Sequence, residues 1–223
     1  MTILSAAQGY ALWAPTYSVE TAVSALETSA VASLDVSLRD KRVLDVGCGI
    51  ARRLVTAREC GATVAMGIDL TPAMLAQARG EPLLAAGDAR ALPVADGAFD
   101  VVWCRLVLGH LPELERAYGE LARACAPDGV VLVTDFHPAA AALGHRRTFR
   151  DEDGELHELE NHVHRVRTHV EAASRAGLSL RVQREMTVDE TVRGFYVRAG
   201  RIDAYERQRG LPLVLALVFA REV

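Results

Sequence analysis

A motif in the first quarter of the chain combines an apolar run, an acid and two glycines. Residues 43–51 read VLDVGCGIA, in which Gly47 and Gly49 flank a single cysteine. Glycines at this spacing let the backbone turn tightly and approach a ligand closely, and the helix expected after them offers free N–H groups. Asp69 ends the next apolar run, where its carboxylate could accept hydrogen bonds from a ribose diol. Together these features predict a site for an adenosine-type cofactor.

Strand-like and helical runs alternate along the part of the chain that must position this site. The alternation predicts parallel strands joined by right-handed crossovers, with helices on both faces of the sheet. Ligands of such sheets bind beyond the carboxyl ends of the strands, at the switch point. Strands are expected at 42–46, 63–68, 82–86, 99–103 and 130–136. Helices are expected at 18–38 with Ser18 as N-cap, 52–59, 72–79, and 112–125 with Pro112 in its first turn.

The pattern changes after His137, where residues 138–161 are mostly polar and charged. A turn at Asp153–Gly154 predicts a short hairpin over 149–156. The remaining elements expected are a helix at 163–175 ended by Gly177, strands at 178–188 and 211–220, and a partly helical segment at 193–209. We therefore predict an α/β fold: a doubly wound, seven-stranded Rossmann-like sheet with the last strand pair antiparallel. Residues 1–223 would form a single domain, with 1–40 as an N-terminal helical cap.

The composition narrows the setting. The 223 residues carry a net charge of −4 and no block of Lys or Arg, which argues against a nucleic-acid partner. The four cysteines are scattered without a Cys-x-x-Cys pair, so neither a zinc site nor a disulfide framework is expected. Residues 1–11 do not resemble a signal peptide, and the apolar stretch 211–220 is too short to span a bilayer. We expect a soluble, cytoplasmic protein with no membrane partner.

Four segments in a fixed order match one known family. They are residues 43–49; 67–70 with 74–75; 87–89 with 92–93; and 99–102 with 121–123 and 127–129. In these segments the chain resembles class I S-adenosylmethionine-dependent methyltransferases, in particular the branch that acts on small molecules. The resemblance runs from about Tyr10 to Gly177 and is strongest from Val43 to Gly129. It implies S-adenosyl-L-methionine as cofactor and S-adenosyl-L-homocysteine as its product.

The resemblance assigns roles along the cofactor. Asp69 would bind the ribose and Asp88 the adenine amino group, while the Ala89 N–H would bind a ring nitrogen. Leu70 and Met74 would sandwich the adenine ring. The cofactor-binding residues expected are Tyr17, Asp45, Gly47, Gly49, Asp69, Leu70, Met74, Asp88, Ala89 and Cys104.

Several of these residues have a purely structural alternative. Asp45 would orient the ammonium group of the methionine part, through water, but it could also be a structural acid tied to backbone N–H groups. Asp69 could cap the helix that begins near Pro72, and Asp88 could be a surface turn acid. The two glycines could simply pack a helix against a strand.

One position departs from the family pattern. A third glycine often stands where this chain has Ala51, a modest change that does not threaten the fold. The Gly-x-Gly-x-x-Gly turn of a nicotinamide dehydrogenase would need glycine at Arg52, so that class is disfavoured. Residues 104–107 also lack the Asn/Asp-Pro-Pro-Tyr/Phe element of nucleic-acid and protein methyltransferases.

Methyl transfer from a sulfonium is an in-line displacement that depends mainly on alignment of the reactants. A base is needed only if the acceptor must lose a proton. His137 and His110 follow the fifth and fourth strands and are the catalytic candidates, although His110 could instead be a cap or packing residue. Asp135 is better explained as a structural acid. The acceptor contacts expected are Tyr10, Trp13, Arg105, Arg146, Phe149 and His162.

Two further segments could enclose the reactants. Tyr10, Trp13 and Tyr17 could face the sulfonium through cation–π attraction, or could pack the first helix on the core. Residues 138–161 are expected as a lid insertion over the acceptor. The histidines at 157, 162 and 164 lack a tight ligand spacing, so no metal is expected.

These features predict an enzyme that moves a methyl group to N, O or C of a small organic acceptor, as a monomer or homodimer. Two alternatives stay open. One is an enzyme of the same fold that binds the cofactor without transferring its methyl group, as a cyclase could. The other is a non-enzymatic binding module.

Overall fold

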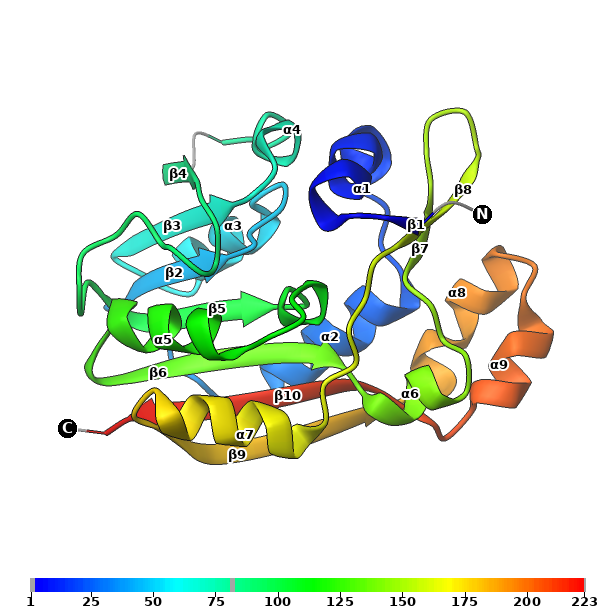
Figure 1. Cartoon of the computed structure of the whole chain (residues 1–223). Helices are drawn as coiled ribbons and strands as arrows, with labels where there is room; N and C mark the ends of the chain where they lie inside the picture. The colour runs from blue at the N-terminus through cyan, green and yellow to red at the C-terminus, as the bar shows by residue number, and fades with distance from the viewer. Residues whose placement is uncertain (1–2, 81–82, 223) are drawn as a thin grey trace.

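A seven-stranded mixed sheet forms the centre of the protein (Figure 1). The computed structural model describes residues 3–80 and 83–222. The strand order is β4-β3-β2-β5-β6-β10-β9, with β10 antiparallel to both of its neighbours and the other contacts parallel. The strands are β2 (Arg42–Val46), β3 (Val64–Asp69), β4 (Leu83–Ala86), β5 (Phe99–Arg105), β6 (Cys125–Phe136), β9 (Leu178–Thr187) and β10 (Pro212–Arg221). The predicted fold class is therefore confirmed, including the final antiparallel pair.

Helices cover both faces of this sheet because its central strands are apolar on both sides. On one face α5 (Glu115–Ala124) and α7 (Val166–Arg175) pack on the core through residues such as Tyr118, Leu121 and Ala173. On the other face α2 (Ala22–Ala32) and α3 (Arg52–Glu59) bury residues such as Leu26 and Leu54. The order of strands reverses direction between β2 and β5, so the switch point lies at their carboxyl ends.

Two predicted helix starts are wrong. The helix expected at 18–38 is α2, which runs from Ala22 to Ala32, and its N-cap is Thr21 instead of Ser18. Thr21 and Ser24 form a reciprocal capping box, with Thr21 Oγ1 accepting the Ser24 N–H at 3.1 Å, and this local pair outcompetes the more distant serine. The helix expected from Pro112 begins at Glu115, after the short turn η2 (Leu108–His110) and an extended residue.

Other boundaries shift by a few residues. The helix expected at 72–79 is the single turn α4 (Pro72–Leu75), and α7 starts at residue 166 instead of 163. The strand expected at 82–86 is seen as β4, and Pro82 lies outside the described residues. Residues 127–129, one of the segments of the family resemblance, lie within β6, where Asp128 adopts a left-handed φ of 62° and residues 126–129 have no partner on β5.

The N-terminus and residues 138–161 form a second structure beyond the carboxyl ends of the parallel strands (Figure 1). The predicted hairpin exists as β7 (Thr148–Arg150) and β8 (Leu156–Leu159). Strand β1 (Ile3–Leu4) pairs with β8 in parallel, so two segments far apart in sequence share this small sheet. The remaining elements are α1 (Ala6–Trp13), η1 (Ala14–Thr16), α6 (Pro138–Ala142), η3 (Glu190–Val192), α8 (Arg193–Arg198) and α9 (Ile202–Gln208). Over the described ranges, every helix is too short or too polar to cross a membrane.

The capping box gives the first testable prediction. Replacing Thr21 with Ala removes the acceptor of the Ser24 N–H, and we expect the free energy of unfolding to fall by about 1 kcal/mol. Urea denaturation measures this change. Ser18→Ala is the matched control, since its side chain caps no helix, and an equal loss in that variant would contradict the assignment.

Candidate functional site

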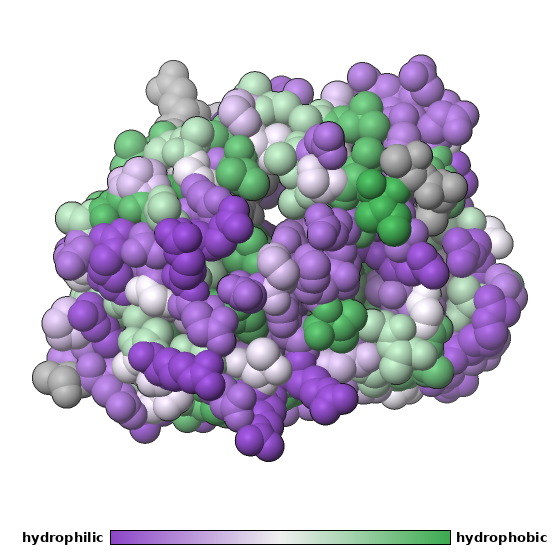
Figure 2. Space-filling model, viewed as in Figure 1, coloured by the Kyte–Doolittle hydropathy of each residue, from purple (hydrophilic) through white to green (hydrophobic). Residues whose placement is uncertain are grey.

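A cavity of about 520 Å³ opens at the carboxyl ends of β2, β3 and β5. Its walls come from the loops after these strands, from α1 and from residues 145–148, and the molecular surface is hollowed on this face (Figure 2). Segments distant in sequence therefore meet at one edge of the sheet. The sequence-predicted residues that line it are Tyr10, Trp13, Tyr17, Gly47, Gly49, Asp69, Leu70, Met74, Asp88, Ala89, Arg105, His110 and Arg146.

The carboxylate of Asp69 joins two loops of the cavity wall. Its Oδ2 accepts the Gly49 N–H at 2.7 Å, and its Oδ1 accepts the Thr71 N–H at 2.8 Å. Thr71, not Asp69, is the N-cap residue of α4. Burial raises the pKa of Asp69 despite these two hydrogen bonds, which lower it. Each oxygen keeps a further lone pair, so the carboxylate can still accept hydrogen bonds from a vicinal diol.

The glycine turn is a left-handed stretch that brings the backbone close to the cavity. Gly47 has a φ of 72° and Gly49 a φ of 58°, a region that favours glycine. A Cβ on Gly47 would collide with Val107, and one on Gly49 would lie 3.2 Å from Met74 Cε. Ala51 also has a positive φ, 62°, which gives a physical reason for the glycine usual at this position in the family it resembles.

Asp45 is a buried carboxylate without a hydrogen bond. Its side chain is fully buried, and neither oxygen has a partner among the described residues. Burial raises the pKa of Asp45 to about 6, and the nearby Arg53 and Arg105 only partly offset this. The structural alternative, an acid tied to backbone N–H groups, is therefore not what the structure contains. A buried anion without a partner fits a cationic group supplied from outside the chain.

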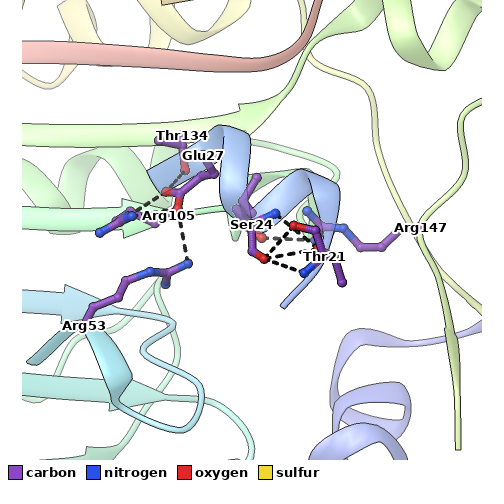
Figure 3. Close-up of polar contacts among 8 residues, drawn as sticks. Thr21, Ser24, Glu27, Arg53, Arg105, Thr134 and Arg147 are labelled. Atoms are coloured by element: carbon purple, nitrogen blue, oxygen red, sulfur yellow. Dashed lines mark hydrogen bonds and ion pairs between the residues drawn. The ribbon is translucent and has the colours of Figure 1, made fainter. Parts of the chain in front are cut away.

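Next to the cavity, Glu27 of α2 pairs with two arginines, Arg53 and Arg105 (Figure 3). Arg105 donates two hydrogen bonds of 2.6 Å to its carboxylate, and Arg53 Nη2 lies 3.7 Å away. Thr134 Oγ1 donates a third hydrogen bond of 2.9 Å. Although burial alone raises the pKa of Glu27, these arginines hold it below its ordinary value. Arg105, expected to contact the acceptor, is thus already neutralised by Glu27.

The expected adenine contacts lie together on one wall. Asp88 and Ala89 line the cavity, and Asp88 forms an ion pair of 2.6 Å with Arg90. The hydrogen bonds from Arg90 lower the pKa of Asp88. Met74 is buried, whereas Leu70 is 49% exposed although it is a large apolar side chain. An exposed leucine at the mouth of a cavity is available to pack against a flat apolar ligand.

The N-terminal aromatic residues form a stack over the cavity. Trp13 stacks on Tyr10 with ring centroids 5.7 Å apart, and Tyr17 meets Trp13 edge-on at 4.9 Å. Phe149, expected to contact the acceptor, is buried behind Trp13 and stacks on it at 4.9 Å. It therefore positions Trp13 from the hairpin side and does not line the cavity.

His110 lines the cavity with both ring nitrogens engaged. Its Nδ1 lies 3.0 Å from the Glu160 carbonyl oxygen, which can only accept, so Nδ1 carries the proton. Nε2 then accepts from Tyr10 Oη at 3.1 Å and from Arg147 Nη1. Burial and the positive charge of Arg147 hold the pKa of His110 far below its ordinary value. The neutral imidazole thus orients Tyr10 and Arg147.

Asp45 and the remaining predicted residues lie outside the cavity lining. Cys104 is fully buried at the end of β5. His137 caps α6 by accepting the Ala139 N–H at 3.2 Å, and its Nε2 lies 3.6 Å from Glu185. His162 lies 3.3 Å from Glu160. Asp135 is buried and accepts the backbone N–H of the next residue, as expected of a structural acid.

The histidines considered for a metal are held separately. His157 lies 2.7 Å from Asp151, and His164 donates to the Leu111 carbonyl oxygen at 2.8 Å. Over residues 3–80 and 83–222, no three His, Cys, Asp or Glu side chains are grouped to hold a metal ion.

Comparison with known proteins matches the same segments. Residues 44–133 match the family model described as a methyltransferase domain. A demethylmenaquinone methyltransferase of Thermus thermophilus is 40% identical over 107 residues, which cover 44% of this chain and 48% of that protein. The chain belongs to the class I S-adenosylmethionine-dependent methyltransferase family.

Solved structures show the same fold. An S-adenosylmethionine-dependent methyltransferase from Mesorhizobium loti has a TM-score of 0.69 at 21% identity, over 88% of this chain and 98% of that one. The [4+2]-cyclase SpnF has a TM-score of 0.71 at 17% identity, with both chains covered completely. The chain spans about half or less of the length of the first curated relatives that it matches.

The sequence did not predict two charged residues, Glu27 and Arg147, that lie at this site. Glu27 lies four residues after Val23, on the apolar stripe of α2, so a charge at a buried helical position was a usable signal. Arg147 carried no such signal, because its burial depends on how residues 138–161 fold back over the sheet.

The unpartnered Asp45 predicts an unusual dependence of stability on pH. Its folded pKa of about 6 exceeds its ordinary value of 3.8, so its contribution to stability is fully present below pH 3.8 and is lost progressively as the pH rises from there through 6. Asp45→Asn removes this loss. We expect the variant to gain stability relative to the wild type by more at pH 8 than at pH 5, and by at most about 3 kcal/mol at pH 8.

Denaturant unfolding at both pH values measures this difference. Asp96→Asn, at a carboxylate whose side chain is 80% exposed, is the control. A variant equally or more destabilised at pH 8 than at pH 5 would contradict the assigned state of Asp45.

Proposed function

We propose that this chain binds S-adenosyl-L-methionine at the Asp69 wall and transfers its methyl group to a small organic acceptor in the adjoining cavity. One observation carries the proposal. The glycine turn and Asp69 open directly into a cavity of about 520 Å³, which has room for a small molecule beside the nucleoside.

The residues present fit this cofactor. Asp69 presents free lone pairs for the ribose hydroxyls, and Leu70 offers an exposed apolar face for the adenine. Asp45 is an orphaned buried anion that a methionine ammonium would satisfy through water. When bound, the sulfonium supplies an activated methyl group.

The protein's own contribution is orientation and exclusion of water. Tyr10, Trp13 and Tyr17 form an aromatic wall, and residues 145–148 also line the cavity. Alignment of this kind can supply roughly 7–11 kcal/mol of a barrier. His110 has its lone pair held by Tyr10 and Arg147, so the site favours an acceptor that reacts without losing a proton to the protein.

The cavity and the relatives support a small-molecule acceptor. The demethylmenaquinone methyltransferase is named for a small-molecule acceptor, and the cavity here is lined by aromatic and apolar side chains beside a few charged ones. The acceptor atom, N, O or C, is open within this proposal.

A second candidate is catalysis without methyl transfer. The fold similarity to the [4+2]-cyclase SpnF extends over both complete chains, and the sheet and cavity required for methyl transfer would equally hold a substrate that cyclises. The two functions differ in whether S-adenosyl-L-homocysteine is produced.

The function is tested by incubating the purified protein with S-adenosyl-L-methionine carrying a labelled methyl group and a small-molecule cell extract. We expect labelled product and S-adenosyl-L-homocysteine to form in equal amounts, as measured by mass spectrometry. A consumed substrate without S-adenosyl-L-homocysteine would favour the cyclase alternative. Failure of the protein to bind either nucleoside in calorimetry would overturn both.

Leu70 provides a variant that separates binding from folding. Because its side chain is 49% exposed at the cavity mouth, Leu70→Ala should leave the melting temperature unchanged. The lost apolar contact should weaken S-adenosyl-L-homocysteine binding about tenfold, as measured by calorimetry. Leu143→Ala, at a leucine that is 69% exposed elsewhere, should change neither quantity, and equal effects of the two variants would contradict the adenine assignment.

A further inference from the structure

Arg147 is a buried cation in the cavity wall. The residue is 7% exposed, and it reaches the cavity from the segment between α6 and β7. Its guanidinium lies 4.6 Å from the centre of the Phe136 ring. Burying a charge in such surroundings is costly unless a counter-ion accompanies it.

No carboxylate in the described ranges accompanies this charge. Arg147 forms no ion pair over residues 3–80 and 83–222, and Glu160, the acid on the same wall, has its carboxylate 3.3 Å from His162 instead. Figure 3 shows Arg147 outside the cluster in which Arg53 and Arg105 converge on Glu27.

The other arginines of the cavity differ from Arg147. Those at 53 and 105 pair with Glu27, Arg90 pairs with Asp88, and Arg146 pairs with Glu158. Arg52 is exposed and donates to the Ser18 carbonyl oxygen. The positive charge of Arg147 is thus the buried one that the described chain leaves without an anion.

The guanidinium is hydrogen-bonded at one end and has no partner among the described residues at the other. Nη1 donates to the Leu106 carbonyl oxygen at 3.1 Å and to His110 Nε2. Nη2 is buried and has no hydrogen-bond partner among the described residues. The contacts at Nη1 fix the orientation of the fork, while Nη2 keeps its N–H donors for a ligand.

We propose that Arg147 is the anion subsite of the acceptor cavity, and that the acceptor carries a carboxylate that Nη2 binds. This inference rests on the proposed function and specifies its substrate class. The neighbouring imidazoles of His110 and His145 are neutral, since burial and Arg147 lower both pKa values. A single positive charge matches a monoanion better than a phosphate dianion.

The position of this subsite places the acceptor at the carboxyl end of β5. Leu106 follows directly after β5 and lines the cavity with Val107, against which Gly47 packs. An anion on Arg147 is therefore held beside the glycine turn. The aromatic and apolar wall of Tyr10, Trp13 and Phe136 favours an acid with a flat apolar body.

The test uses benzoate, with benzamide as its uncharged counterpart, on protein saturated with S-adenosyl-L-homocysteine. At constant ionic strength, benzoate at ten times its dissociation constant should raise the melting temperature by about 3–6 °C, and benzamide should raise it clearly less. Formate, the smallest carboxylate, should also raise the melting temperature more than chloride does. Because formate has no ring, this comparison does not depend on the shape of the probe.

Arg147→Met should abolish the difference between benzoate and benzamide in the rise of the melting temperature. Arg146→Met, at the exposed neighbour paired with Glu158, should keep this difference. Arg147→Lys keeps the charge without the planar fork and should keep part of the difference. Because Arg147→Met removes a buried charge without a partner, its melting temperature without ligand should equal or exceed that of the wild type.

The inference is overturned if no carboxylate raises the melting temperature of the wild type more than it raises that of the Arg147→Met variant. It is also overturned if, without ligand, the Arg147→Met variant melts well below the wild type, because that would mark a structural role. Calorimetry with S-adenosyl-L-homocysteine separates this from the proposed function. All three variants should bind it within about twofold of the wild type, and loss of binding in the wild type would instead sink the proposed function itself.

Discussion

The whole site depends on one buried carboxylate that bridges two loops. Asp69 accepts N–H groups from Gly49, after β2, and from Thr71, after β3. These loops carry the left-handed glycine turn and the start of α4, the two backbone segments that a nucleoside would meet. Because the strands are parallel neighbours, their carboxyl ends meet at one edge, and a single acid can hold both loops in register.

The buried charges around this edge fall into two groups. Glu27, Arg105 and Arg53 satisfy one another beneath the cavity and stabilise its floor. Within residues 3–80 and 83–222, Asp45 has no hydrogen-bond partner and Arg147 has no ion pair, and each is more than nine-tenths buried. Such groups cost folding free energy. Arg147 lines the cavity and Asp45 lies in β2, two residues before the lining residue Gly47, so their retention is understandable if a ligand bound in the cavity pairs with Arg147 directly and with Asp45 through water. Natural proteins often give up stability at sites that bind ligands.

The sequence was most informative where a role depends on residues close together in the chain. The glycine turn, Asp69, Leu70 and Met74 lie within or just after the strands that place them, so local spacing was enough to predict the sheet and the cavity wall. It was least informative where placement depends on long-range folding. Arg147 is brought to His110 by a segment that crosses the sheet edge, and His137, although it follows β6, turns away to cap α6. The start of α2 was predicted wrongly because Thr21 and Ser24 form a capping box, which displaces Ser18 as the N-cap.

The most direct test of the central claim is a crystal structure of the protein with S-adenosyl-L-homocysteine. The account places the ribose hydroxyls within hydrogen-bonding distance of Asp69, the adenine against Leu70, and the homocysteine part toward Asp45. Density for the nucleoside at another place, or an intact Asp69 bridge with an empty cavity at saturating ligand, would contradict it.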